Sequence, residues 1–134
     1  MPGLSIHVVD VSCGIVAAGM RIEVFALTAD GGRRLIAGGD LSAKGTLDNA
    51  ALDAVLAAGA YEVVFHVAAY YRNAGVPVPP VPFLDVVSYR FGIADPRQHY
   101  HLPMKCTPLG IFLLPGRRVV TPAGTARTAP RQCA

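Results

Sequence analysis

The stretch HYHLPMKC at residues 99–106 predicts a β-strand whose two faces differ in chemistry. Successive strand residues point to opposite sides of a sheet, so the stretch separates into two sets of side chains. One face carries titratable or rigid side chains, namely His99, His101, Pro103 and Lys105. The other face carries side chains suited to a core, namely Tyr100, Leu102, Met104 and Cys106. The first face is either a solvated surface or a functional site, because lysine is almost never fully buried without a partner or a function.

Similar strand patterns recur along the chain between turn-forming residues. Residues 76–82 contain four prolines and predict a stiff loop, whereas residues 47–58 could hold a helical turn or two and residues 68–75 predict a short helix. Apolar, β-branched or alternating runs predict further strands over residues 4–11, 21–27, 34–37, 61–67, 83–91 and from 111 to 114. Seven or eight short strands separated by turns are typical of an all-β sandwich.

The composition indicates one folded domain in the cytoplasm. The chain has 134 residues, of which 52% are hydrophobic and 16% are charged, so it has enough apolar surface for a core. It has no run of 18 apolar residues and no evident secretory leader. Its three cysteines are widely spaced, which favours neither a disulfide framework nor a zinc cluster. We therefore expect no membrane association.

Charge is distributed unevenly along the chain. Residues 96–134 contain six Lys or Arg and no acid, although the net charge is only +3. No aromatic residue lies among the arginines of the C-terminal end to stack on a base, so we expect no nucleic-acid partner. We expect residues 1–118 to form the domain and residues 119–134 to form a basic, flexible tail.

His7 is a second candidate for chemistry, because it lies in an otherwise apolar strand pattern. It is either a hydrogen-bonded histidine of the core or a site residue. Two histidines on one strand face and a distant third can hold zinc, but no Cys or acid is placed to complete such a set. His66 is assigned no role. Asp10 and Asp85 are single carboxylates, which gives no support to the carboxylate pair of a glycosidase.

Four blocks of sequence together resemble the transthyretin and 5-hydroxyisourate hydrolase family: LSIHVVDVSCG, YEVVFHVAAYY, FLDVVSYRFGIADP and HYHLPMKCTPLG. The similarity covers roughly residues 4–116. It implies a transthyretin-like, or prealbumin-like, β-sandwich of two four-stranded sheets with one short helix. It also implies a homotetramer with a channel between dimers. In that channel the family's hydrolases open the ring of 5-hydroxyisourate without a metal, and transthyretin binds thyroid hormone.

The resemblance also assigns site residues. His7 and His101 match the two histidines of the hydrolases, whereas Thr46 stands where those enzymes have an arginine. The YRGS ending of the hydrolases falls on residues 114–117, where Arg117 could supply a guanidinium from a shifted position. The expected substrate-binding residues are Thr46, His99, Pro103, Phe112, Leu114 and Arg117. No metal or other cofactor is expected.

Lys105 occupies a position that is aliphatic in the family, on the strand face that lines the channel. It could act as a cationic clamp for an oxyanion, as a general base or as a Schiff-base amine. Alternatively, it only balances a charge at a subunit interface. The leading hypothesis is hydrolysis of a cyclic amide by His7, His101 and Lys105. The alternatives are a diverged ring opening, cyclisation or elimination on a secondary metabolite, and a transthyretin-like protein that binds a small ligand without reaction.

Overall fold

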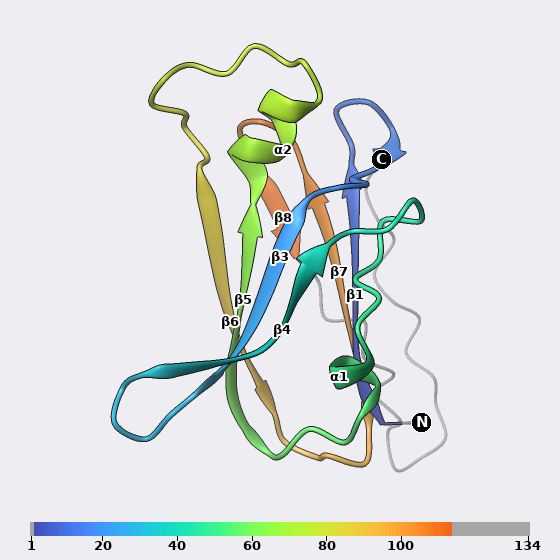
Figure 1. Cartoon of the computed structure of the whole chain (residues 1–134), viewed down its shortest axis with the longest axis vertical. Coiled ribbons are helices and arrows are strands. Elements are labelled where there is room, and N and C mark those ends of the chain that lie inside the picture. The colour runs from blue at the N-terminus through green and yellow to red at the C-terminus, as the bar shows by residue number, and fades with distance from the viewer. Residues whose placement is uncertain (1, 114–134) are drawn as a thin grey trace, which may run out of the picture.

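The computed structural model describes residues 2–113, which form two four-stranded sheets packed face to face (Figure 1). Sheet A has the strand order β2-β1-β7-β8, and sheet B has the order β4-β3-β5-β6. Two short helices accompany the sheets, where the resemblance implied one. In chain order the elements are β1 (Gly3–Asp10), β2 (Ile15–Val16), β3 (Arg21–Leu27), β4 (Arg33–Asp40), α1 (Ala50–Asp53), β5 (Gly59–His66), α2 (Val67–Asn73), β6 (Val86–Ile93), β7 (His99–Cys106) and β8 (Ile111–Leu113).

The core fills the space between the sheets with alternate residues of their central strands. On β7 the predicted alternation is confirmed, because Leu102, Met104 and Cys106 are buried and Tyr100 is half-buried. The same period on β1 leaves its other residues on the outer side of sheet A. The buried side chains of the other central strands are Leu4, Ile6 and Val8 on β1, Ile22 and Val24 on β3, and Val63 and Phe65 on β5.

Asp10 is a buried carboxylate that joins α2 to the end of β1. It is 2% exposed and accepts hydrogen bonds from the Tyr71 hydroxyl at 2.9 Å and the Tyr70 hydroxyl at 3.3 Å. The backbone N–H of Ser12 donates a further bond at 3.1 Å. Burial and the charge of Asp10 raise the pKa of Tyr70 to about 12, so this hydroxyl remains a donor near neutral pH. The carboxylate that stood alone in the sequence therefore has its partners 60 and 61 positions away.

Several strand boundaries in the structure differ from those predicted from the sequence. The strand predicted over residues 83–91 lies instead at Val86–Ile93, since the proline-rich loop continues to residue 85. The strand β2 was not predicted, because two residues are too few to show a period. The turns at residues 29–32 and 108–110 are confirmed by the bonds from Thr28 N to Gly32 O and from Thr107 N to Gly110 O. The predicted domain boundary at residue 118 and the tail lie outside the described residues.

No helix among residues 2–113 is long and apolar enough to cross a membrane, and the longer of the two has seven residues.

Candidate functional site

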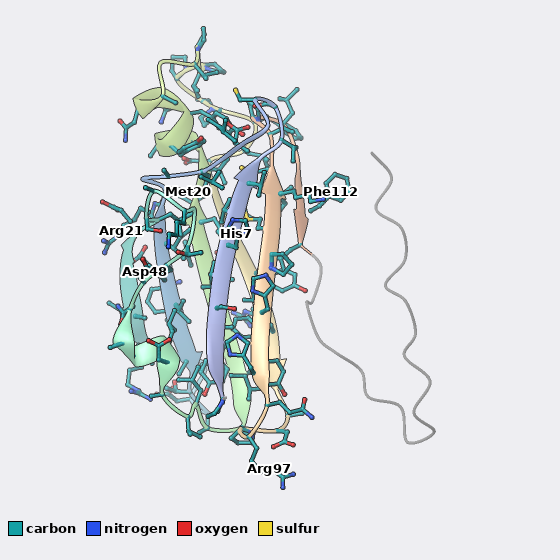
Figure 2. The ribbon with its side chains drawn as sticks, turned by 90° about the vertical axis from the view of Figure 1, so that its right-hand side faces the viewer. His7, Met20, Arg21, Asp48, Arg97 and Phe112 are labelled. Carbon is teal, nitrogen blue, oxygen red and sulfur yellow. The ribbon has the colours of Figure 1, made fainter. Side chains whose placement is uncertain are left out.

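Parallel pairing of β1 with β7 gathers the candidate residues on the outer face of sheet A. In this ladder Ser5 lies opposite His101, and His7 lies opposite Pro103. His7 and His101 are therefore diagonal neighbours on adjacent strands. His7 is half-buried on this outer face, so the interpretation of His7 as a core histidine is wrong (Figure 2). The two histidines come together because β1 and β7 run in the same direction and both alternate with period two.

Ser5 bridges two imidazoles on this face. Its hydroxyl Oγ lies 2.7 Å from Nδ1 of His101 and 2.9 Å from Nε2 of His99. The sequence reasoning missed Ser5, although its position two residues before His7 places it on the same strand face. The missing information was the register between β1 and β7, which no pattern within either segment contains.

Burial and neighbouring imidazoles control the protonation of His101. Burial lowers its pKa below the ordinary value of 6.5, and the nearby His7 and His99 lower it further. His101 is therefore neutral near pH 7 and has a ring nitrogen that can accept a proton. Within residues 2–113 no group of three or more His, Cys, Asp or Glu side chains is placed to hold a metal ion.

The segment that carries Thr46 runs along the free side of β1. Gly45 adopts a φ of +76°, and a Cβ at this position would lie 2.7 Å from Cβ of Val16 and 2.9 Å from the carbonyl oxygen of Val8. Only glycine allows so close an approach. The approach lets Thr46 form a β-bridge with His7, so this predicted substrate-binding residue does lie at the edge of the histidine face.

The hydroxyl of Thr46 is already engaged by its own loop. Its Oγ1 donates to Oδ1 of Asp48 at 2.9 Å and lies 2.9 Å from Oγ of Ser42. The position at which the hydrolases of the family were expected to carry an arginine therefore presents a neutral hydroxyl beside a carboxylate. Any positive charge that the site needs must come from another residue.

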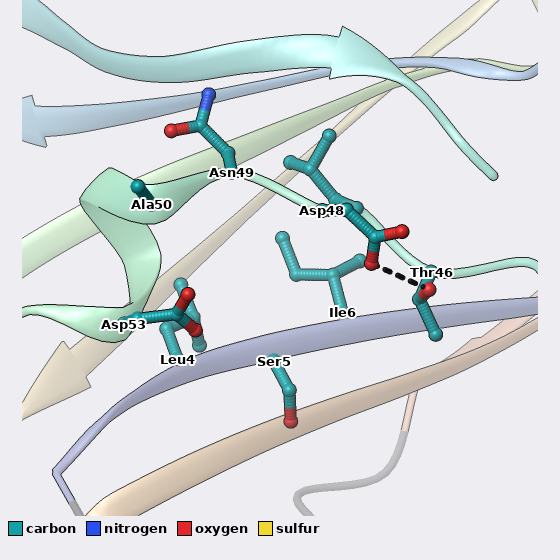
Figure 3. A pocket seen from close by; sticks show the side chains of 9 residues that line it. Leu4, Ser5, Ile6, Thr46, Asp48, Asn49, Ala50 and Asp53 are labelled. Carbon is teal, nitrogen blue, oxygen red and sulfur yellow. Dashed lines mark hydrogen bonds between the residues drawn. The ribbon is translucent and has the colours of Figure 1, made fainter.

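An open pocket of roughly 570 Å³ lies beside this segment, between β1 and residues 46–53 (Figure 3). Ser5 and Thr46 belong to its lining, but His7, His101 and Lys105 do not. Figure 3 shows the Ser5 side chain pointing to the opposite side of β1 from Ile6. The candidate site is therefore the outer face of β1 and β7, with this pocket at its edge.

Three further predicted residues extend the same face toward β8. Pro103 lies opposite His7, and Lys105 lies opposite Phe112 of β8 in the ladder. Lys105 is half-buried, whereas Phe112 is 71% exposed and points away from the sandwich (Figure 2). The predicted residues Leu114 and Arg117 lie outside the described residues. The structure thus places six predicted residues on one face: His7, His99, His101, Pro103, Lys105 and Phe112.

Comparisons with known proteins identify the family of the chain. Residues 4–113 match the HIUase/Transthyretin family. The 5-hydroxyisourate hydrolase 2 of Rhizobium meliloti is 41% identical over 108 residues, covering 80% of this chain and 89% of that protein. A crystal structure of sea bream transthyretin with thyroxine has a TM-score of 0.74 at 29% identity and covers 89% of this chain and 98% of its own. The 5-hydroxyisourate hydrolase of Klebsiella pneumoniae has a TM-score of 0.69 at 25% identity and covers 87% of this chain and all of its own. The chain, with its transthyretin-like β-sandwich, therefore belongs to the HIUase/transthyretin family.

Proposed function

We propose that this protein is a hydrolase that opens a cyclic amide, with 5-hydroxyisourate as its substrate and His7 and His101 as its acid and base. The observation that carries the proposal is the placement of these two imidazoles as diagonal neighbours on one half-buried face. Relatives named 5-hydroxyisourate hydrolase support the choice of substrate. Imidazoles suit this chemistry because their ordinary pKa lies near the working pH.

The lowered pKa of His101 favours this residue as the general base. In the proposed reaction, His101 accepts a proton from water as the water oxygen attacks the amide carbonyl. The C–N bond of the ring then breaks, and the departing nitrogen takes a proton from His7. The water supplies the hydroxyl of the new carboxyl group, so the hydrolysis is complete without a cofactor, as the family resemblance implies.

Lys105 is the proposed source of positive charge in this site. The hydrolysis creates a negative oxygen on the attacked carbonyl, which a nearby cation stabilises. Thr46 cannot supply that charge, and its hydroxyl is engaged by Asp48. Lys105 lies on the same face, one alternate position after Pro103, which itself lies opposite His7. The ammonium of Lys105 therefore replaces the arginine that the family's hydrolases were expected to carry at the position of Thr46.

The proposed working form is a cytoplasmic homotetramer with the site in a channel between its dimers. The exposed Phe112 supports a partner subunit over this face, because a large exposed aromatic side chain beside half-buried polar groups is typical of an interface. A small molecule is the expected substrate.

A second candidate function is a related reaction on a less polar substrate. Two observations favour it. Thr46 offers a ring substrate no guanidinium, and Phe112 adds an apolar surface to the face. Ring opening, cyclisation or elimination of a secondary metabolite could each use the two imidazoles and the amine of Lys105. Binding without reaction, as in transthyretin, is the remaining alternative.

The test is an ultraviolet assay of freshly generated 5-hydroxyisourate with the wild-type protein and three variants. His101→Ala should slow decay by about 10²–10⁴-fold, because it removes the base. Lys105→Ala should slow decay by about tenfold, the effect of losing roughly 1.4 kcal/mol of charge stabilisation in the transition state. Lys44→Ala is the matched control, since Lys44 is the only other lysine of the chain and is exposed on a turn outside the strands; its rate should stay unchanged.

Each alternative has its own result. A folded wild-type protein that does not accelerate decay would overturn hydrolysis of 5-hydroxyisourate. Trapping of Lys105 by borohydride with a carbonyl metabolite would then favour the second candidate. Tight binding of an apolar ligand that survives His101→Ala, without turnover, would identify a carrier.

A further inference from the structure

Ser5 connects one exposed and one half-buried imidazole through a single hydroxyl. His101 is half-buried, whereas His99 at the start of β7 is exposed. The Ser5 oxygen lies within hydrogen-bond distance of both rings, 2.7 Å from Nδ1 of His101 and 2.9 Å from Nε2 of His99. These three side chains form a continuous chain from the candidate site to solvent.

The single proton of the Ser5 hydroxyl sets the donor and acceptor order of these two hydrogen bonds. A serine hydroxyl has one proton to donate, so it must donate to one ring and accept from the other. In the first form, His101 Nδ1–H donates to Ser5, and Ser5 donates to Nε2 of His99. In the second form, His99 Nε2–H donates to Ser5, and Ser5 donates to Nδ1 of His101. When both rings are neutral, both therefore carry the proton on Nδ1 in the first form and on Nε2 in the second.

We propose that His99, Ser5 and His101 form a proton relay that links Nε2 of His101 with solvent. In the first form, Nε2 of His101 accepts a proton, and Nδ1 of the same ring releases one to Ser5. Ser5 passes its own proton to Nε2 of His99, and His99 releases the proton on Nδ1 to water. Each N–H or O–H bond that breaks is replaced by one that forms, and the chain finishes in its second form with both rings neutral.

This passage removes the proton that His101 has taken from water without leaving a charge on the ring. A positive charge at His101 is unfavourable because the ring is half-buried and lies near His7 and His99. Lys105 contributes a further cation to the same face, and Phe112 is the β8 residue opposite it. Ser5 is thus a positioning residue that couples the tautomer of His101 to that of His99. Use of the relay in turnover rests on the proposed function, whereas its linkage of the two rings does not.

Nitrogen NMR of the histidine rings at a pH where both are neutral tests the linkage without any substrate. The wild type should show equal tautomer fractions for His99 and His101, and Ser5→Thr, which keeps a hydroxyl, should preserve that equality. Ser5→Ala should make the two fractions differ. The matched control is Ser88→Ala, an exposed strand serine on sheet B, which should behave as the wild type. Unequal fractions in the wild type, or equal fractions that persist in a folded Ser5→Ala variant, would overturn the relay.

Hydrolysis rates then test its use. At low buffer concentration, Ser5→Ala and His99→Gln should each lower kcat by about tenfold with little change in KM, a smaller loss than that of a missing acid or base. Added imidazole should restore the rate of these variants and leave Ser88→Ala unaffected, because a merely structural loss is not rescued by a soluble proton carrier. Variants with wild-type rates at low buffer would overturn the relay, whereas linked tautomers in a protein without hydrolase activity would overturn only the proposed function.

Discussion

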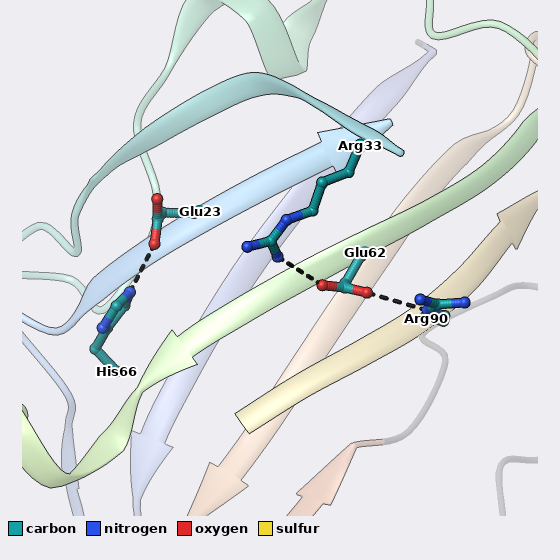
Figure 4. A network of polar contacts seen from close by, with 5 residues as sticks. All are labelled: Glu23, Arg33, Glu62, His66 and Arg90. Atoms are coloured by element: carbon teal, nitrogen blue, oxygen red, sulfur yellow. Dashed lines mark hydrogen bonds and ion pairs between the residues drawn. The ribbon is translucent and has the colours of Figure 1, made fainter. Parts of the chain in front are cut away.

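The outer faces of both sheets carry basic side chains, but their neighbours differ: on sheet B they lie beside acids, and on β1 and β7 of sheet A they lie beside one another. On sheet B, Glu62 is 7% exposed, and its carboxylate binds Arg33 at 2.8 Å and Arg90 at 3.0 Å (Figure 4). On the same face, Nε2 of His66 lies 2.7 Å from Oε1 of Glu23. The acids of this face thus lie beside bases on neighbouring strands.

On sheet A, the outer faces of β1 and β7 gather His7, His99, His101 and Lys105 without a carboxylate from either strand. The only acid of these two strands is Asp10, which points inward. A cluster of bases without such acids is costly to maintain, because like charges disfavour one another when they are protonated. The ion pairs of sheet B stabilise the fold, whereas the clustered imidazoles of sheet A are the candidates for chemistry.

Removal of one histidine from each sheet tests most directly whether the two outer faces differ in function. His7→Ala should lower kcat/KM for 5-hydroxyisourate by about 10²–10⁴-fold, because His7 is the proposed acid. His66→Ala, on the opposite sheet, should change the rate by less than about twofold, since a surface change far from the site contributes little. Steady-state kinetics measures both. Equal losses in the two variants would remove the distinction between the faces.

The free energy of unfolding should depend more on the buried Asp10 than on the ion pairs of the outer face of sheet B. Asp10→Ala should lower the free energy of unfolding by about 3 kcal/mol, because it leaves the buried hydroxyls of Tyr70 and Tyr71 without their acceptor. Glu62→Ala should cost only about 1 kcal/mol, since both of its arginine partners are at least half exposed. Urea denaturation followed by circular dichroism measures both values. Asp10→Asn, which keeps an acceptor oxygen, is the control and should lose less than Asp10→Ala.

Patterns within single segments predict the faces of this fold well. The alternation of HYHLPMKC correctly separated the core residues Leu102, Met104 and Cys106 from the outer histidines. It succeeds because the strand period is a local property of the backbone. The turn at residues 29–32 was predictable for the same reason, since glycine supplies the positive φ of Gly31.

Contacts between distant segments could not be predicted in this way. The bridge from Ser5 to His99 and His101 depends on the register of β1 against β7, and the burial of Asp10 depends on where α2 folds back. The placement of Thr46 beside His7 came only from the family resemblance, because no local pattern links a turn to a strand nearly forty residues earlier. Site chemistry arises mainly from such pairings, so residue types alone indicated candidates without their partners.

The smallest expected effect is a pH dependence that originates on sheet A. The pKa of His101 is lower in the folded protein than its ordinary value of 6.5, so the unfolded chain binds this proton more readily. The contribution of His101 to stability is therefore complete above pH 6.5 and is lost as the pH falls toward the folded pKa. The free energy of unfolding should decrease between pH 7.5 and 5, and His101→Asn should reduce that decrease. The same shift places the acidic limb of kcat/KM below pH 6.5, because the base must be neutral to act. An acidic limb above pH 6.5, or an identical pH dependence of stability in His101→Asn, would contradict the assignment of His101 as a base that burial and its neighbours keep unprotonated.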